Sequence, residues 1–242
     1  MMSLLERLRE EKALKVSGGI YHRLQIVFAY NSNRIEGSRL SEEQTRYIYE
    51  THSVGLDGEE FIQLDDILET LNHFEAFDQM LDSVEAPLTE DWFKTYHAIL
   101  KRGTSQSKLD HYRVGDYKLI PNVIGFRETS TPEDVADHMQ QLLTTYHQIA
   151  NSDFEAVLDF HVNFERIHPF SDGNGRVGRL AMFKEMLRLD LVPFIITDQV
   201  KPYYYRGLSE WGENNGFLMD TCLSCQDQMK AYLDYFRIDY KY

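Results

Sequence analysis

The sequence predicts a mainly α-helical protein, built as a single domain with a small β-hairpin flap. Apolar residues recur at helical spacing along most of the chain, capping signals precede several of these segments, and one short stretch departs from the pattern. Hydrophobic residues make up 43% of the 242 residues, which is enough for one buried core. No repeat or long linker divides the chain. We expect an N-terminal helical region over 1–88 and a core that carries the chemistry over 89–242.

Apolar spacing and capping residues predict each helix in turn. In segment 20–34, Ile20, Leu24 and Val27 share one helical face. Ser41 and Gln44 form a capping box, which opens a helix. The helices predicted in this way cover 20–34, 41–49, 64–84, 89–100, 131–150, 154–167, 176–189, 201–212 and 218–236.

Two helix starts carry clear signals. Thr89 follows Pro87 and is a good N-cap residue. The run Thr131-Pro132-Glu133-Asp134 offers a cap residue, a proline at the first helical position and two acids near the positive helix end. We expect that helix to run to about Ala150.

The stretch Tyr112–Phe126 breaks the helical pattern. It combines β-branched and aromatic residues with turn signals at Gly115 and Pro121-Asn122, which predicts a hairpin over about 112–126. Because an isolated hairpin is only marginally stable, it should lie on the helices as a mobile flap.

The charge of the chain argues against a polyanionic partner. Lys and Arg number 25 and Asp and Glu number 39, so the net charge is −14, which would repel DNA and anionic membranes. A phosphate-bearing ligand therefore needs a local basic site. No apolar run approaches the roughly 18 residues that would span a bilayer. The N-terminus has no signal-peptide core, so we expect a cytoplasmic protein.

Two cysteines are too few for a disulfide scaffold. Cys222 and Cys225 have a spacing found in metal sites, but no second ligand pair follows them. We expect both to be core residues of a helix.

The segment Ile167–Leu180 reads IHPFSDGNGRVGRL and carries the strongest signal for chemistry. Gly173, Asn174 and Gly175 lie where a loop meets a helix, so their backbone N–H groups and the helix dipole suit a phosphate. Arg176 and Arg179 are three residues apart and share a helix face. Two guanidinium groups beside these backbone N–H groups suit a di- or triphosphate.

Three further residues of this segment fit the same chemistry. Asp172 is adjacent to these backbone N–H groups and could hold Mg²⁺, which takes one or two carboxylates together with phosphate oxygens. His168 begins the loop and could accept a proton from an attacking hydroxyl. Phe170 is apolar in a polar loop and should anchor it to the core. Each residue alone has an ordinary structural explanation, but together they favour one function.

The segment resembles the Fic family (filamentation induced by cAMP), whose motif is H-x-F-x-(D/E)-G-N-G-R-x-x-R. Similarity extends from about residue 28 to about residue 228. It implies transfer of AMP from ATP to a Ser, Thr or Tyr hydroxyl of a target protein, with release of pyrophosphate. The matching positions are His168, Phe170, Asp172, Gly173, Asn174, Gly175, Arg176 and Arg179.

The resemblance assigns a role to each of these positions. It implies that His168 is the general base and that Asp172 holds Mg²⁺. Asn174 and the loop amides would hold the α-phosphate region, Arg176 the β-phosphate and Arg179 the γ-phosphate. The hairpin would align a target segment by strand-like pairing. Its residues are Tyr117, Lys118, Leu119, Ile120, Val123 and Ile124.

A second motif lies upstream, at Ser32-Asn33-Arg34-Ile35-Glu36-Gly37. It resembles the inhibitory motif (S/T)-x-x-x-E-(G/N) of the self-inhibited Fic class. Ser32 and Glu36 are four residues apart on one helical face, and Gly37 lets the helix end. Glu36 could then occupy Arg179, so that ATP binds with a misplaced γ-phosphate. The alternatives are an ordinary acid at a helix end, and a glutamate that also positions water to remove AMP.

The adenine base needs an apolar or aromatic contact. Relatives carry a Tyr pair at the helix that follows Lys201-Pro202, which makes Tyr205 the first candidate and Tyr204 the second. An aromatic run is also typical of a core. Relatives often have an Asn where this chain has Gly212, so the resemblance does not extend to this part of the base recognition.

Three function classes therefore compete: transfer of AMP to protein hydroxyls, transfer of another nucleotide or phosphate-containing group on the same scaffold, and a non-catalytic nucleotide-binding regulator. Gly175 argues against the phosphate-transferring relatives, which carry Lys there, and His168 argues against a non-catalytic module. The acidic, aromatic tail argues against a DNA-binding role. Self-modification and a homodimer remain open as expectations from the resemblance.

Overall fold

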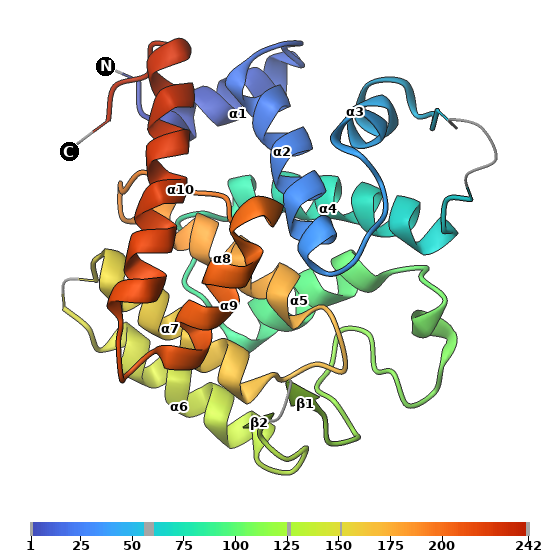
Figure 1. Cartoon of the computed structure of the whole chain (residues 1–242), viewed down its shortest axis with the longest axis vertical. Coiled ribbons are helices and arrows are strands. Elements are labelled where there is room, and N and C mark those ends of the chain that lie inside the picture. Colours follow the sequence, from blue (N-terminus) through green and yellow to red (C-terminus); the bar gives the residue numbers. More distant parts are fainter. Residues whose placement is uncertain (1, 56–60, 125–126, 151, 241–242) are drawn as a thin grey trace.

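The computed structural model describes residues 2–55, 61–124, 127–150 and 152–240, and these are mainly helical (Figure 1). Two short 3-10 turns and one two-stranded sheet complete the described elements. The helices are α1 (Leu4–Leu14), α2 (Ile20–Ile35), α3 (Glu42–Thr51), α4 (Leu64–Asp82), α5 (Glu90–Lys101), α6 (Val135–His147), α7 (Phe154–Ile167), α8 (Asn174–Arg188), α9 (Lys201–Glu210) and α10 (Gly216–Tyr235).

Capping residues set the helix starts where the sequence predicts them. Ser41 and Gln44 form the reciprocal capping box of α3, and the Thr89 hydroxyl accepts from the Trp92 N–H at the start of α5. The helix signalled by Thr131 begins later than predicted, at Val135. The Thr131 carbonyl accepts from the N–H groups of both Asp134 and Val135, so a tight turn precedes the regular helix.

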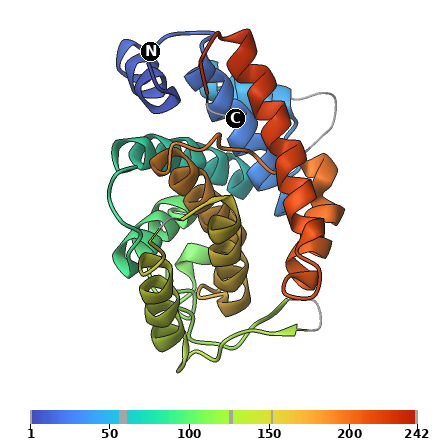
Figure 2. The same ribbon diagram turned by 90° about the vertical axis from the view of Figure 1, so that its left-hand side faces the viewer.

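Helices α7 and α8 form the centre of the molecule. Helices α2, α4 and α5 lie on one side of this pair, and α9 and α10 cross over another side (Figures 1 and 2). Phe28 of α2 meets Phe183 of α8 with ring centroids 5.2 Å apart, and Phe77 of α4 lies 5.6 Å from the same ring. These aromatic contacts join the N-terminal helices to the helix that follows the motif.

A second apolar cluster lies between α7, α8, α9 and α10. It contains Cys222 and Cys225, which are both buried and not bonded to each other, as expected for core residues. Their neighbours include Tyr204, within α9, and Trp211, directly after its last residue. This packing fixes α9 beside the motif.

The hairpin exists, but the prediction placed it too early. Strands β1 (Val123–Ile124) and β2 (Arg127–Glu128) are antiparallel, whereas residues 112–122 form turns. Tyr117 and Lys118 are buried rather than part of a strand. Residues 125 and 126, at the end of the predicted hairpin, lie outside the described residues. In Figure 2 the strands β1 and β2 extend along the bottom of the molecule.

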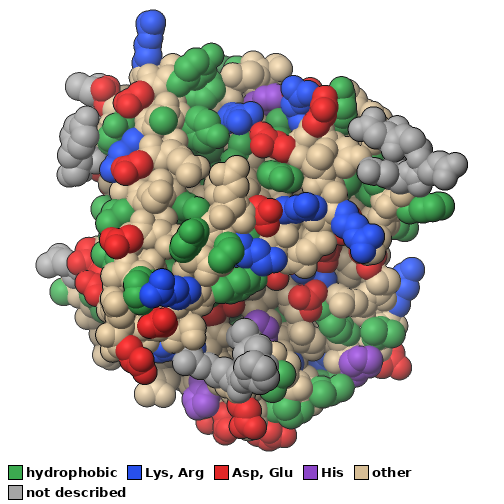
Figure 3. Space-filling view, in the orientation of Figure 1, with side chains coloured by type: hydrophobic (Ala, Val, Ile, Leu, Met, Phe, Trp, Pro, Cys, Tyr) green, Lys and Arg blue, Asp and Glu red, His purple; other side chains and the backbone are tan. Residues whose placement is uncertain are grey.

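The surface shows mixed charge. On the face in Figure 3, acidic, basic and apolar side chains are interspersed outside the grey atoms. Among the described residues, no helix combines the length and the apolarity needed to cross a bilayer.

Candidate active site

The loop between α7 and α8 is held in place by contacts with the core. Phe170 is fully buried, and its ring stacks on His97 of α5 with centroids 4.0 Å apart, so it anchors the loop as predicted. The Asn174 amide closes the loop, since its oxygen accepts from the Phe170 N–H at 2.9 Å and its nitrogen donates to the Phe170 carbonyl at 2.8 Å. The side chain of Asn174 therefore shapes the loop and is not free for a ligand.

The loop turns into α8 through a residue that favours glycine. Gly173 has a φ of +80° and precedes the first residue of the helix. The first N–H groups of α8 have no partners within the helix, and the helix dipole adds positive potential there. The start of α8 is therefore suited to bind an anion, as the sequence predicts.

A cavity of about 590 Å³ opens at this helix start. It gathers residues from five segments that are distant in sequence. They are Glu36 at the end of α2, Val123 of β1, Glu165 and His168 at the end of α7, Gly175 and Arg179 of α8, and Tyr204, Tyr205 and Ser209 of α9. The structure thus brings together the predicted base, one of the two predicted phosphate-binding arginines, the tyrosine pair and the upstream glutamate.

Glu36 contacts Arg179, as its spacing in the upstream motif predicts. Glu36 Oε1 accepts from Arg179 Nη2 at 2.7 Å. The same guanidinium donates to Ser32, from Nε to the hydroxyl at 3.1 Å and from Nη2 to the carbonyl at 2.9 Å. Helix α2 ends at Ile35, and Gly37 follows with a φ of +105°. The last turn of α2 therefore occupies the Arg179 guanidinium.

The Glu36 carboxylate also lies against the start of α8. A Cβ atom at Gly175 would overlap this carboxylate, so the glycine makes room for it. Burial opposes ionisation of Glu36, but the charges of Arg179 and Arg176 hold its pKa below the ordinary value. An anion thus sits at the helix N-terminus, where a phosphate would bind.

His168 has an unusual backbone and an uncharged ring. It follows the last residue of α7 with a φ of +52°, in the left-handed region that non-glycine residues seldom adopt. Burial, and next the positive charge of Lys118, lower the pKa of His168 to about 4. At neutral pH the imidazole is therefore uncharged, so it can accept a proton.

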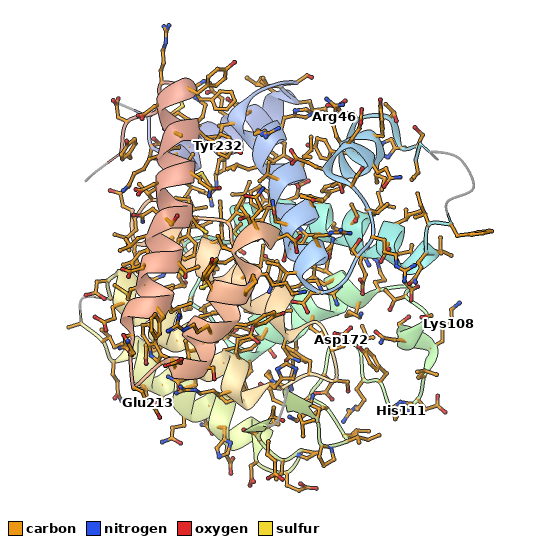
Figure 4. All side chains as sticks on the ribbon, in the orientation of Figure 1. Arg46, Lys108, His111, Asp172, Glu213 and Tyr232 are labelled. Carbon is orange, nitrogen blue, oxygen red and sulfur yellow. The ribbon has the colours of Figure 1, made fainter. Side chains whose placement is uncertain are left out.

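Asp172 belongs to a network of ion pairs beneath the loop. Its Oδ2 lies 2.7 Å from Lys101 Nζ and 3.2 Å from Arg176 Nη2. Burial opposes its ionisation, but Arg176 and Lys101 hold its pKa far below the ordinary value. Figure 4 labels Asp172 in the interior of the view, apart from the peripheral Lys108 and His111.

Arg176 lies in this network and is not among the residues that line the cavity. It is almost fully buried, and its Nη1 lies 2.6 Å from Glu69 Oε2 of α4. Glu69 Oε1 also contacts Lys101 Nζ, at 2.5 Å. No local pattern points to Glu69 or Lys101, because each is a single charged residue on a helix far from the motif.

The two tyrosines occupy different places. Tyr204 is fully buried, and its hydroxyl lies 2.6 Å from His161 Nε2. Tyr205 is 40% exposed and lines the cavity. Of the two candidates, Tyr205 alone offers an accessible ring face to a ligand.

The predicted flap residues also divide into two groups. Leu119, Ile120 and Val123 are more than half exposed, and Val123 lines the cavity. Tyr117 and Lys118 are buried, so their side chains are not available to a target segment in this arrangement. Ile124 belongs to β1.

Glu165 is a cavity residue that the sequence analysis missed. Burial raises its pKa to about 8, and its Oε2 lies 3.9 Å from His168 Nδ1. Its spacing of three residues before His168 could have revealed it. Within the described ranges, no group of three or more His, Cys, Asp or Glu side chains is arranged to hold a metal. A divalent ion at Asp172 would therefore take further ligands from a bound phosphate and water.

Fold and site together define a helical domain with a candidate base beside a helix start that is suited to bind an anion. The sequence profile of the Fic/DOC family matches residues 87–186 of this chain. This match covers the end of the α4–α5 connection through most of α8.

The relatives agree with this domain. The chain is 26% identical over 213 residues to protein adenylyltransferase Fic of Nematostella vectensis, which covers 84% of the chain and 48% of the relative. The chain thus spans about half the length of this relative. Two solved structures share the fold. A Fic domain containing signaling protein from Bacteroides thetaiotaomicron has a TM-score of 0.71 at 22% identity, covering 96% of this chain and 90% of that one. Fic-1 from C. elegans has a TM-score of 0.70 at 21% identity, covering 95% and 69%.

Proposed function

We propose that this protein is an adenylyltransferase that moves AMP from ATP to a Ser, Thr or Tyr hydroxyl of a target protein. The observation that carries the proposal is the cavity in which His168, the start of α8 and Arg179 meet. An anion-binding helix start beside an uncharged imidazole suits nucleophilic attack on a phosphate. The name of the relative from Nematostella vectensis supports the same reaction.

In the proposed reaction the target hydroxyl oxygen attacks the α-phosphorus of ATP. A new phosphorus–oxygen bond forms to the target, and the bond to the bridging oxygen of pyrophosphate breaks. His168 accepts the hydroxyl proton, and pyrophosphate leaves with the electron pair. The N–H groups of Gly175 and its neighbours hold the phosphate chain, and Arg179 binds its far end.

Mg²⁺ fits this proposal through Asp172. When bound, the ion would neutralise charge on the phosphate oxygens. Asp172 is ionised and lies beside the anion-binding loop, but its Oδ2 is held by Lys101 and Arg176. Arg176 is the proposed ligand of the β-phosphate, which requires it to exchange part of its contact with Glu69 for the nucleotide.

The proposed regulation places Glu36 as an inhibitor. Its carboxylate takes the Arg179 nitrogen that a γ-phosphate needs, and it lies on Gly175 at the helix start. Ser32 and Gly37 support this placement, the first by contacting Arg179 and the second by ending the helix. ATP can then bind only with its γ-phosphate displaced.

The remaining parts of the proposal concern recognition. Tyr205 is the proposed adenine contact, with Tyr204 behind it. The exposed Leu119, Ile120 and Val123 would meet the target segment, together with the edge of β1. We also propose a cytoplasmic location, self-modification and a homodimer.

A panel of labelled nucleotides tests the reaction. The chain with Glu36→Gly should become labelled, or should label a target protein, with ATP carrying the label on the α-phosphate but not on the γ-phosphate. Mass spectrometry should find an added AMP on a hydroxyl residue. Labelling from the γ-phosphate, or from another nucleotide in preference to ATP, would instead indicate a different transfer on the same scaffold. No labelling from any nucleotide would favour a binding protein.

The metal proposal predicts the behaviour of Asp172→Ala. Transfer should fall sharply, and ATP binding measured by calorimetry should lose its dependence on Mg²⁺, because the carboxylate proposed to hold the ion is gone. Asp65→Ala is a suitable control, since this exposed carboxylate contacts Ser105 outside the cavity. A Mg²⁺ titration that is the same in Asp172→Ala and the parent would contradict the role.

A further inference from the structure

Lys118 is a buried cation within the flap segment, and the transfer reaction as proposed leaves it without a role. Its side chain is almost fully buried. The ammonium nitrogen donates to Asn122 Oδ1 and Thr129 Oγ1, both at 2.7 Å, and reaches the Ile167 carbonyl at 3.4 Å. These partners come from both sides of the hairpin and from the end of α7, so one side chain joins the flap to the helix that presents His168.

The main chain of Lys118 contacts the other side of His168. Its N–H donates to the Pro169 carbonyl at 2.9 Å. Lys118 thus binds the carbonyl groups of the residues immediately before and after His168. Asn122, which the ammonium orients, donates in turn to the Phe170 carbonyl at 3.1 Å.

These hydrogen bonds flank a residue whose backbone conformation is unfavourable. His168 has a φ of +52°, and a residue with a Cβ atom keeps such a conformation only when its surroundings hold it. Ser130 adds one more bond to the Ile167 carbonyl, at 3.3 Å. The left-handed turn at His168 is therefore fixed by the flap segment and not by the motif loop alone.

The charge of Lys118 acts on the same ring. After burial, it is the largest influence that lowers the pKa of His168. The opposing groups that face His168 are Glu165 from α7, Glu36 from α2 and Asp172 from the loop, and Arg179 of α8 lines the same cavity. Burial lowers the pKa of Lys118 itself to about 8, so the ammonium stays mostly charged at neutral pH.

We propose that Lys118 is a positioning residue for His168: it holds the left-handed backbone through the two flanking carbonyls and places a positive charge near the imidazole. This inference rests on the proposed function only in treating His168 as the base. A lysine that merely satisfies local carbonyls would affect stability and would leave the titration of His168 unchanged.

The test compares Lys118→Met, Lys118→Arg and the control Lys94→Met, each in the parent and in the Glu36→Gly background. Lys94 is a suitable control because it pairs with Asp116 and covers the Tyr117 ring, next to the flap but outside the cavity. NMR of the His168 ring is followed across the pH range in which circular dichroism shows the fold intact. AMP transfer is measured in the Glu36→Gly background.

In Lys118→Met the pKa of His168 should rise by roughly one unit, since a nearby like charge is removed. The kcat for transfer should fall at least about tenfold while the KM for ATP changes little, because the base is misplaced and the nucleotide contacts are intact. Lys118→Arg should keep the low pKa and recover part of the rate. Lys94→Met should match its background in both measurements.

Two results would overturn the proposal. The first is an unchanged His168 titration in Lys118→Met, whatever happens to the rate. The second, decisive if Lys118→Met does not fold, is a raised pKa of His168 in Lys118→Arg, which retains the charge. If no variant or parent transfers AMP, the proposed function fails, while the NMR titration still decides whether Lys118 controls His168.

Discussion

Replacing His168 with alanine should lower AMP transfer by roughly 10²–10⁴-fold, the usual contribution of a general base. Measured in the Glu36→Gly background, the loss should appear in kcat. ATP affinity should remain close to that of the background protein, because the proposed phosphate contacts come from residues of α8 and not from the imidazole. Calorimetry with ATP and Mg²⁺, combined with initial rates of labelling, separates the two quantities.

The pH dependence gives this prediction a second test. The pKa of His168 is about 4 in the absence of nucleotide, so the ring is already deprotonated at neutral pH. Acidification should reduce the rate only as the pH approaches that value, whereas an ordinary histidine would lose activity near pH 6.5. His111→Ala, at an exposed histidine labelled in Figure 4, is the control and should keep full activity. A His168→Ala protein as fast as its background would show that another group accepts the proton.

The largest expected gain comes from Glu36→Gly. If the arrangement that can transfer AMP makes up about 1% of the parent population, removing the carboxylate could raise transfer by up to about 100-fold. Arg179 would keep its contacts with Ser32, so the guanidinium would stay in place, and its Nη2 would lose the Glu36 carboxylate while still donating to the Ser32 carbonyl. The gain should appear in the rate rather than in ATP affinity, because ATP can also bind unproductively in the parent.

Two further variants sharpen this experiment. Glu36→Gln keeps the shape of the side chain but weakens the pairing with Arg179, and should give an intermediate gain. Glu50→Gly removes an acid of α3 that pairs with His22, and should give no gain. Equal initial rates in the parent and Glu36→Gly would dismiss the inhibitory role.

A chase with unlabelled ATP examines whether Glu36 also removes the mark. If its carboxylate positions water against an AMP-modified hydroxyl, label should disappear in the parent and persist in Glu36→Gly. Label that persists equally in both would leave Glu36 as an inhibitor alone.

Local signals predicted the helices because caps and apolar stripes act within a few residues. The start of α7 at Phe154 and its end at Ile167 agree with the prediction, and Asp153 caps it by accepting from the Ala156 N–H. The contact between Glu36 and Arg179 was predictable for a similar reason. Ser32 and Glu36 are four residues apart and therefore lie on one helical face. The resemblance then supplied Arg179 as their partner.

The flap and the ion pairs under the loop could not be predicted in this way. The hairpin position depends on where Lys118 and Asn122 find carbonyl partners in the motif loop, and these partners lie about 50 residues further along the chain. Lys101 and Asp172 are 71 residues apart. Such pairings are set by the way the helices pack, which no local pattern records.

The location of Glu36 limits how the proposed inhibition can be relieved. It ends α2, and α2 is a structural helix whose Leu24 and Phe28 are buried against the rest of the core. Proteolytic trimming that removed α2 would therefore expose the rings of Phe77 and Phe183 and yield an unstable remnant, not a constitutively active fragment. Under the proposed inhibition, activation has to act on the final turn of α2 around Glu36 and Gly37. The proposed inhibitory residue thus belongs to a helix of the core and cannot be removed by proteolysis without loss of the fold.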